Sequence, residues 1–223
     1  MYQLAVFDIA GTTVDEGAAV YEAMRSALAG EGVEVGDREL DLNKGRDKRT
    51  ALTDLLSSAG HDADTATVDR VYEAFSTTLR EAYDRRPPVA MPGARECLAT
   101  LRGRGMKLAL STGYTREVAE SVLAHAGLTV GPEGDVDVLV STSEVAAARP
   151  APYLIHHAME LTGVQDVRAV ISAGDTIADV RSHRNAGVTS VAVLSGDTDE
   201  DTLRSEGPDH VLGSVAELPA LLG

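Results

Sequence analysis

The stretch Leu4-Ala5-Val6-Phe7-Asp8-Ile9-Ala10-Gly11-Thr12-Thr13 places an apolar run directly before an acidic residue and a loop of small residues. A short apolar run that ends in small and polar residues is typical of a buried strand. Such a strand would present Asp8 at its carboxyl end, where a carboxylate can act as a nucleophile or bind a metal ion. Two residues later, Ala10 places a methyl group where a second acid could have stood.

After this stretch, apolar runs alternate with amphipathic segments as far as the C-terminus. A first strand over 3–7 would be followed by strands over 107–111, 136–140, 169–173, 190–194 and 209–212. Helical periods cover 93–104, 115–126, 150–162, 177–186 and 215–222. Because strands that alternate with helices form parallel sheets, we predict an α/β fold with a Rossmann-like core.

The interval between the first two strands is too long for a single crossover connection. It contains only helical periods, over 18–28, 46–57 and 66–85. We therefore predict an inserted helical cap over 15–88, with the α/β core formed by 1–14 and 89–223. The acidic stretch 196–201 is predicted to be a solvated loop.

The composition narrows the classes of function. Of the 223 residues, 43% are hydrophobic, and the formal net charge of −15 argues against nucleic acid or an anionic membrane as the main partner. A small anionic substrate is compatible with this charge if a metal ion or a few arginine and lysine side chains neutralise it locally. No apolar run approaches the roughly 20 residues of a membrane span. The single cysteine, Cys97, suits a reducing compartment, so we expect a cytoplasmic protein.

Two acidic residues follow the strand predicted over 169–173. Their spacing of four places Asp175 and Asp179 on one face of a helix start, close to Asp8 if the two strands are neighbours. Three converging carboxylates repel each other, and Mg²⁺, which prefers oxygen ligands, would offset that repulsion. Alternatively, Asp175 is a helix N-cap and Asp179 is an exposed helix acid.

Two further segments after predicted strands carry groups that suit an anion. Ser111 and Thr112 offer hydroxyls, and Gly113 lets backbone N–H groups approach a ligand closely just before a predicted helix. Arg149 can hold a phosphoryl group or an aspartate in a two-pronged grip that lysine lacks. The alternatives are an ordinary capped turn and a surface arginine.

These four segments, in this order and with a helical insertion after the first, resemble the haloacid dehalogenase superfamily with a type-1 cap. The resemblance covers essentially the whole chain. It implies that Asp8 attacks phosphorus and forms an aspartyl-phosphate. It also implies a phosphoryl site formed by Ser111, Thr112, Gly113 and Arg149, and a Mg²⁺ site formed by Asp8, the Ala10 carbonyl, Asp175 and Asp179.

Several stretches resemble the phosphonatase branch of that superfamily, which cleaves the carbon–phosphorus bond of phosphonoacetaldehyde. Ala10 replaces an acid that most members of the superfamily carry, and Arg149 replaces their usual lysine. The stretches are Asp8-Ile9-Ala10-Gly11-Thr12-Thr13-Val14-Asp15, Ser111-Thr112-Gly113-Tyr114-Thr115-Arg116-Glu117, Arg149-Pro150-Ala151-Pro152-Tyr153, and Gly174-Asp175-Thr176 with Arg184-Asn185-Ala186-Gly187.

The alanine has a chemical meaning. In a phosphatase the second acid protonates the departing alkoxide and later activates water. A carbon–phosphorus bond has no leaving-group oxygen, and its carbon needs an electron sink. An amine supplies one by condensing with a neighbouring carbonyl to a protonated imine, which leaves as an enamine. Ala10 therefore predicts a catalytic lysine in the cap.

Two cap lysines, Lys44 and Lys48, compete for this role. The resemblance of Gly45-Arg46-Asp47-Lys48 to the Gly-x-x-Lys pattern of phosphonatase caps selects Lys48. Lys48 also stands at the start of a predicted helix, whose positive end disfavours an ammonium ion. The nearby cations Lys44, Arg46 and Arg49 would act in the same direction. Alternatively, residues 44–49 form a basic solvated turn.

The chain departs from phosphonatase caps at three positions. Ala51 stands where they carry a histidine that relays protons, Lys44 replaces a methionine, and Ala18 replaces a cysteine. Water, Tyr114 or a further group that the sequence does not identify would move the protons instead, and we expect Tyr114 and Gly45 to contact the substrate or the cap. The chain therefore resembles a phosphonatase-like sister group.

We accordingly expect a Mg²⁺-dependent hydrolase of phosphonoacetaldehyde or another 2-oxoalkylphosphonate. The alternatives are a phosphate-monoester hydrolase or phosphomutase of the same fold, and a phosphonate- or phosphate-binding protein without turnover. The resemblance also suggests a homodimer through the cap. An apolar stripe of Val20, Met24 and Ala27 would serve that interface or pack inside.

Overall fold

The computed structural model describes all 223 residues. A six-stranded sheet forms its centre, in the order β5-β4-β1-β6-β7-β8, and every neighbouring pair in it is parallel. This confirms the predicted α/β fold with a parallel sheet. The strands are β1 (Leu4–Asp8), β4 (Lys107–Ser111), β5 (Val138–Val140), β6 (Val170–Gly174), β7 (Thr189–Val193) and β8 (His210–Leu212).

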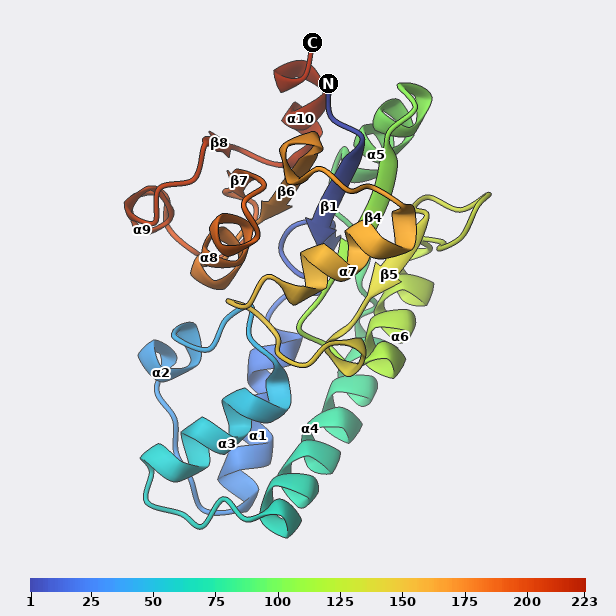
Figure 1. The fold of residues 1–223 in the computed structure, drawn as a ribbon. Helices are drawn as coiled ribbons and strands as arrows, with labels where there is room; N and C mark the ends of the chain where they lie inside the picture. Colours follow the sequence, from blue (N-terminus) through green and yellow to red (C-terminus); the bar gives the residue numbers. More distant parts are fainter.

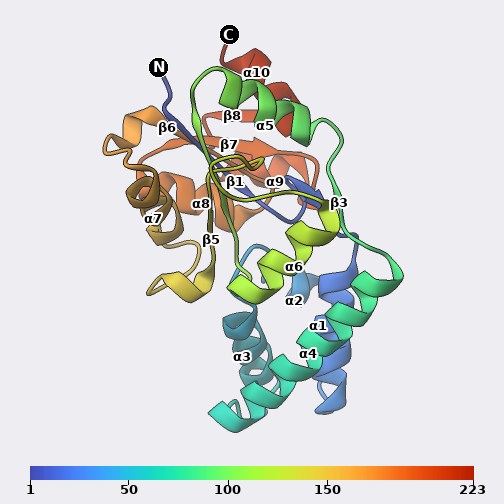
Figure 2. The same ribbon diagram turned by 90° about the vertical axis from the view of Figure 1, so that its right-hand side faces the viewer.

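Helices cover both faces of the sheet (Figures 1 and 2). The alternation of β1 separates the two layers, because Ala5 and Phe7 belong to one apolar cluster and Leu4 and Val6 to another. The first layer contains α5 (Ala94–Gly103), α6 (Arg116–Ala126) and α10 (Leu218–Leu221). The second contains α7 (Tyr153–Thr162), α8 (Ile177–Ala186) and α9 (Glu200–Ser205). Single 3-10 turns occur at Thr142–Glu144, Val167–Ala169 and Val215–Glu217.

A helical insertion lies beyond the carboxyl end of β1 (Figure 1). It consists of α1 (Ala19–Gly30), α2 (Asp37–Asp41), α3 (Lys48–Ser58) and α4 (Thr65–Arg85). The chain enters it through β2 (Val14–Asp15) and leaves it through β3 (Val89–Ala90), and these two short strands pair antiparallel. The pair stands where we placed the boundary between core and cap, although the division into two domains stays a prediction.

The apolar stripe of the first helix packs inside the insertion. Val20, Met24 and Ala27 are all buried in the large apolar cluster, together with Phe75 and Leu79 of α4. Association of two copies through the insertion therefore needs another surface, and it stays a prediction. None of the helices is both long and apolar enough to cross a membrane.

Four elements escaped the sequence prediction: β2, β3, α2 and α9. The first two have two residues each and α2 has five, which is too few to show a period. The predicted loop 196–201 is wrong at its end, since α9 begins at Glu200. The local signal was present: the Asp199 side chain caps α9 by accepting the Thr202 N–H at 2.9 Å.

Candidate active site

The carboxyl ends of three neighbouring strands of the sheet meet at the side of the core that faces the insertion. In the register of the sheet Asp8 lies beside Ser111, and Phe7 lies beside Ala173, two residues before Asp175. A cavity of about 240 Å³ opens there, and its lining comes from both the core and the insertion. Asp8, Ala10, Thr112, Gly113, Arg149 and Asp175 line it from the core. Lys44, Gly45 and Lys48 line it from the insertion, and Tyr114 lines it from the segment after β4.

Arg149 ties together two of the predicted acidic residues. Its Nη2 lies 2.7 Å from Oδ1 of Asp8, and its Nη1 lies 2.8 Å from Oδ1 of Asp179. The same Nη2 also reaches Ser111, at 2.8 Å from the backbone oxygen and 3.2 Å from the hydroxyl. Arg149 and both aspartates are buried, so the alternative of a surface arginine is wrong. The planar fork gives each carboxylate its own nitrogen, whereas a lysine would have to meet both through a single ammonium group.

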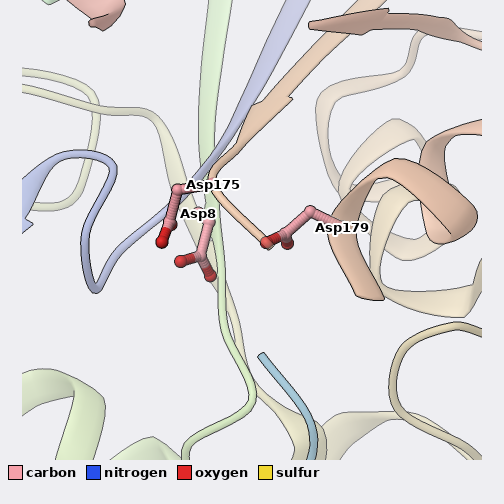
Figure 3. Close-up of side chains that lie close together, drawn as sticks. All are labelled: Asp8, Asp175 and Asp179. Carbon is pink, nitrogen blue, oxygen red and sulfur yellow. The ribbon is translucent and has the colours of Figure 1, made fainter. Parts of the chain in front are cut away.

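Three carboxylates converge at the sheet edge (Figure 3). One oxygen each of Asp8, Asp175 and Asp179 lies within 4.8 Å of the others. Glycines leave the space that these groups occupy: a Cβ on Gly11 would stand 2.5 Å from Asp175 Oδ2, and one on Gly174 would stand 2.4 Å from Asp179 Cγ. The chain therefore encloses an oxygen-rich pocket that suits a hard divalent cation.

The second acidic residue of the α8 segment has two tasks. Asp179 forms a capping box with Thr176, whose backbone N–H it accepts at 3.1 Å, and it pairs with Arg149. Asp179 is fully buried, so the alternative that it is an exposed helix acid is wrong. The N-cap of α8 is Thr176, and Asp175 accepts a hydrogen bond from Thr12 at 2.7 Å.

Burial governs the protonation of these acids. It raises the pKa of Asp8 to about 7, against the opposing effect of Arg149 and with a further contribution from Asp179. Burial likewise raises the pKa of Asp175, and the nearby Asp8 and Asp179 carboxylates add to the effect. A cation among these groups would lower the pKa of both aspartates and favour the ionised carboxylates.

The predicted anion-binding residues 111–113, at the end of β4, have two different roles. Thr112 and Gly113 line the cavity, whereas Ser111 lies beneath Arg149 and is absent from the lining. Gly113 also meets the insertion, because a Cβ there would stand 2.7 Å from the carbonyl oxygen of Arg46. Gly45 approaches the core in the same way, against Thr176.

Lys48 is the first residue of α3, is buried, and lines the cavity on the side of the insertion. Its Nζ donates to the Arg46 carbonyl at 3.1 Å and lies 5.5 Å from the centre of the Tyr114 ring. Burial lowers the pKa of Lys48, and Arg149 contributes in the same direction, while Glu16 and Asp8 oppose it. The direction matches our expectation, but its cause is burial and Arg149, not the cations beside Lys48 in the sequence.

Lys44 has the opposite electrostatic environment. Its Nζ lies 2.8 Å from Asp41 and 3.4 Å from Asp197. Although partial burial opposes them, these carboxylates raise the pKa of Lys44 and keep its amine protonated. Of the two competing lysines, Lys48 is thus the one suited to be a neutral nucleophile.

Sequence reasoning missed two parts of the cavity wall. Glu16 and Tyr21 line it from the segment that follows β2, and Ser195 to Asp197 line it from the loop after β7. Ser195 donates to the Gly11 carbonyl at 2.7 Å and so fixes the loop that carries Ala10. No motif marks these residues. Only their positions in the sequence could have indicated them: Glu16 directly follows the first motif, and the 195–197 loop directly follows a strand of the sheet.

A family model described as haloacid dehalogenase-like hydrolase matches residues 2–187. The chain belongs to this family of hydrolases. It is also 35% identical, over 212 residues, to a phosphonoacetaldehyde hydrolase of Bacillus cereus (strain AH187), a match that covers 88% of this chain and 77% of that relative. Phosphonoacetaldehyde hydrolases of other Bacillus cereus strains match at 34–35% identity. The chain is therefore a member of the phosphonatase-like branch of the family.

Solved structures show the same fold. A hydrolase from Pseudomonas syringae superposes with a TM-score of 0.88 at 23% identity, covering 99% of this chain and 97% of that one. A phosphonoacetaldehyde hydrolase-like protein from Oleispira antarctica gives 0.85 at 22% identity, with 99% and 91% covered. A β-phosphoglucomutase from Clostridium difficile gives 0.83 at 18% identity, with 98% and 93% covered.

Proposed function

We propose that this hydrolase cleaves the carbon–phosphorus bond of phosphonoacetaldehyde or a closely related 2-oxoalkylphosphonate. The observation that carries the proposal is the placement of Lys48. Its amine, with a lowered pKa, shares one cavity with Asp8, and Ala10 stands where a phosphate-ester hydrolase would need an acid. The 35% identity to phosphonoacetaldehyde hydrolase supports the same activity.

The two ends of the cavity suit the two ends of such a substrate. Arg149, Thr112 and the backbone at Gly113 would bind the phosphonyl oxygens, with Ser111 holding Arg149 in place. The carbonyl carbon would then lie toward the insertion, where Lys48 can reach it. A cavity of about 240 Å³ has room for a small phosphonate.

The reaction begins with the amine of Lys48. It condenses with the substrate carbonyl and releases water, which leaves a protonated imine. Asp8 attacks phosphorus, and the electron pair of the carbon–phosphorus bond moves toward the imine nitrogen, so carbon leaves as an enamine. Water then hydrolyses the aspartyl-phosphate, which releases one proton, and the enamine carbon takes up one proton to become an imine again. A second water hydrolyses this imine, which frees Lys48 and the carbonyl product.

The donor set fits Mg²⁺, because it consists only of carboxylate and carbonyl oxygens: Asp8, Asp175, Asp179 and the backbone oxygen of Ala10. When bound there, the ion would neutralise charge on the phosphonyl oxygens and keep the nucleophile ionised. Arg149 restrains the same nucleophile from the other side, since its Nη2 lies 2.7 Å from Asp8.

The fold also supports a second candidate, a phosphate-monoester hydrolase or phosphomutase, since a β-phosphoglucomutase shares it. Ala10 counts against this candidate, because the departing alkoxide would lose its positioned acid. General acid–base help of this kind is worth about 10²–10⁴-fold.

A phosphate-release screen separates the two candidates. Phosphonoacetaldehyde and other 2-oxoalkylphosphonates are compared with sugar phosphates and nucleotides, each with and without Mg²⁺. We expect Mg²⁺-dependent release from a 2-oxoalkylphosphonate and little from the esters. Turnover of an ester at a much higher kcat/KM would refute the proposal.

A further inference from the structure

One carboxyl group of the cavity lining lies on the side of Lys48. Glu16 directly follows β2, is half-buried and lines the cavity with Lys48. Its Oε2 accepts a hydrogen bond from the Tyr83 hydroxyl at 2.7 Å, and its Oε1 accepts one from the Tyr114 hydroxyl. Tyr83 comes from α4 of the insertion and Tyr114 from the core, so the carboxyl group is held from both parts.

The other carboxyl groups of the cavity have partners elsewhere. At the phosphoryl end, Asp8 forms an ion pair with Arg149, and Asp175 accepts a hydrogen bond from Thr12. Asp197 pairs with Lys44, and Asp15 accepts the Gly17 N–H. Their contacts leave Glu16 as the carboxyl group placed to serve the amine.

Helix α3 offers no proton of its own beside the amine. One turn after Lys48 stands Ala51, which is fully buried and carries no titratable group. Tyr114 is a poor acid in this setting, because burial and the neighbouring Glu16 raise its pKa well above the usual value. Burial also raises the pKa of Glu16, although both tyrosines and Lys48 oppose that shift, which favours the acid form relative to an exposed glutamate.

We infer that Glu16 is a catalytic acid–base residue that moves protons for the formation and hydrolysis of the imine at Lys48. The inference rests on the proposed function and deepens it. Hydrogen bonds from Tyr83 and Tyr114 hold the carboxyl group and stabilise its ionised form after the proton has left. The two tyrosines act as positioning residues.

The proton transfers balance over the cycle. The neutral amine adds to the carbonyl carbon, and a proton passes from nitrogen to oxygen to give a carbinolamine. Glu16 donates its proton to the carbinolamine hydroxyl, the carbon–oxygen bond breaks, and water leaves with the electron pair. The nitrogen lone pair completes the carbon–nitrogen double bond. After the phosphorus has been transferred, the enamine carbon takes up one proton, which balances the proton released when water hydrolyses the aspartyl-phosphate, and the imine is restored. Glu16 then takes a proton from the water that adds to the imine carbon, which restores its acid form. The carbinolamine passes its hydroxyl proton to nitrogen and separates into the carbonyl product and the neutral amine.

The test measures how fast the imine forms. Enzyme and phosphonoacetaldehyde are mixed, samples are quenched with borohydride at successive times, and the reduced adduct at Lys48 is quantified by mass spectrometry. We expect Glu16→Gln, which keeps an acceptor for a tyrosine but carries no acid, to slow adduct formation about 10²-fold or more. The matched control is Glu22→Gln on the exposed face of α1, which should form the adduct at the wild-type rate.

Chemical rescue distinguishes a proton donor from a structural part. Glu16→Ala should be slow, and added formate should restore part of its rate in proportion to the formate concentration. If Glu16→Ala does not fold, the Glu16→Gln rate decides alone. A wild-type rate in Glu16→Gln, or no acceleration of a folded Glu16→Ala by formate, would overturn the assignment. Absence of any adduct in the wild-type protein would instead refute the proposed function itself.

Discussion

A single methyl group at Gly113 should disturb the fit between the insertion and the core. A Cβ at this position would stand 2.7 Å from the Arg46 carbonyl oxygen and 3.1 Å from that of Gly45, and both are backbone atoms that cannot rotate away. Ordinary contact begins at 3.4 Å, so the loop before α3 has to retreat by about 0.7 Å. Lys48 follows this loop by two residues, and its amine would retreat with it.

We expect Gly113→Ala to lower kcat for phosphonoacetaldehyde by about 10- to 100-fold, because a misplacement near 1 Å can cost about 10²-fold. The melting temperature should change little, since the backbone of Gly113 lies outside the left-handed region and accepts alanine without strain. The matched control is Gly103→Ala at the end of α5, where a Cβ would meet nothing within 4 Å.

The assay is steady-state phosphate release by wild-type protein and both variants, with thermal unfolding of each. Wild-type kcat in Gly113→Ala would show that the contact between loop and core has no part in placing Lys48. Equal losses in Gly113→Ala and Gly103→Ala would point to a general effect of the added methyl group.

Three further predictions concern the acids and the fold. Ala10→Asp should raise hydrolysis of a sugar phosphate at least about 10²-fold from a low baseline, because it restores a proton donor for the departing alkoxide; an unchanged rate would show that the missing acid is not what limits it. Mg²⁺ should raise the melting temperature more at pH 8 than at pH 6, since protons compete for Asp8, whose pKa is raised to about 7; an equal effect at both values would contradict the assignment. Burial lowers the pKa of His183 to about 4 from 6.5, so the unfolded chain binds the extra proton and stability is lost as pH falls through this window. Urea unfolding should therefore show a loss between pH 6.5 and 4 that is up to about 3 kcal/mol smaller in His183→Asn, and equal losses would refute it.

The sequence predicted the sheet well because its strands are buried on both faces and read as apolar runs. Asp8 and Asp175 were found for the same reason, since each directly follows such a run and parallel strands end at one edge. The pair β2 and β3 was not found, because two residues in each strand carry no period and their pairing joins Val14 to Ala90 across the whole insertion.

The residues of the site that escaped prediction depend on tertiary contacts. Glu16 is one acid among many in a chain of charge −15, and only the hydroxyls of Tyr83 and Tyr114 distinguish it. Ser111 was expected to face a phosphoryl group, whereas its backbone and hydroxyl oxygens both accept from Arg149. The lowered pKa of Lys48 was foreseen, but its physical cause, burial between the insertion and the core, becomes visible only in three dimensions.

Borohydride trapping followed by peptide mapping shows whether Lys48 carries the substrate as an imine. Wild-type enzyme is reduced during turnover of phosphonoacetaldehyde, alongside Lys48→Arg and Lys44→Arg. We expect one adduct, on Lys48, in the wild type and in Lys44→Arg, with no adduct and no phosphate release in Lys48→Arg. An adduct on Lys44, or full phosphate release by Lys48→Arg, would contradict this role of Lys48.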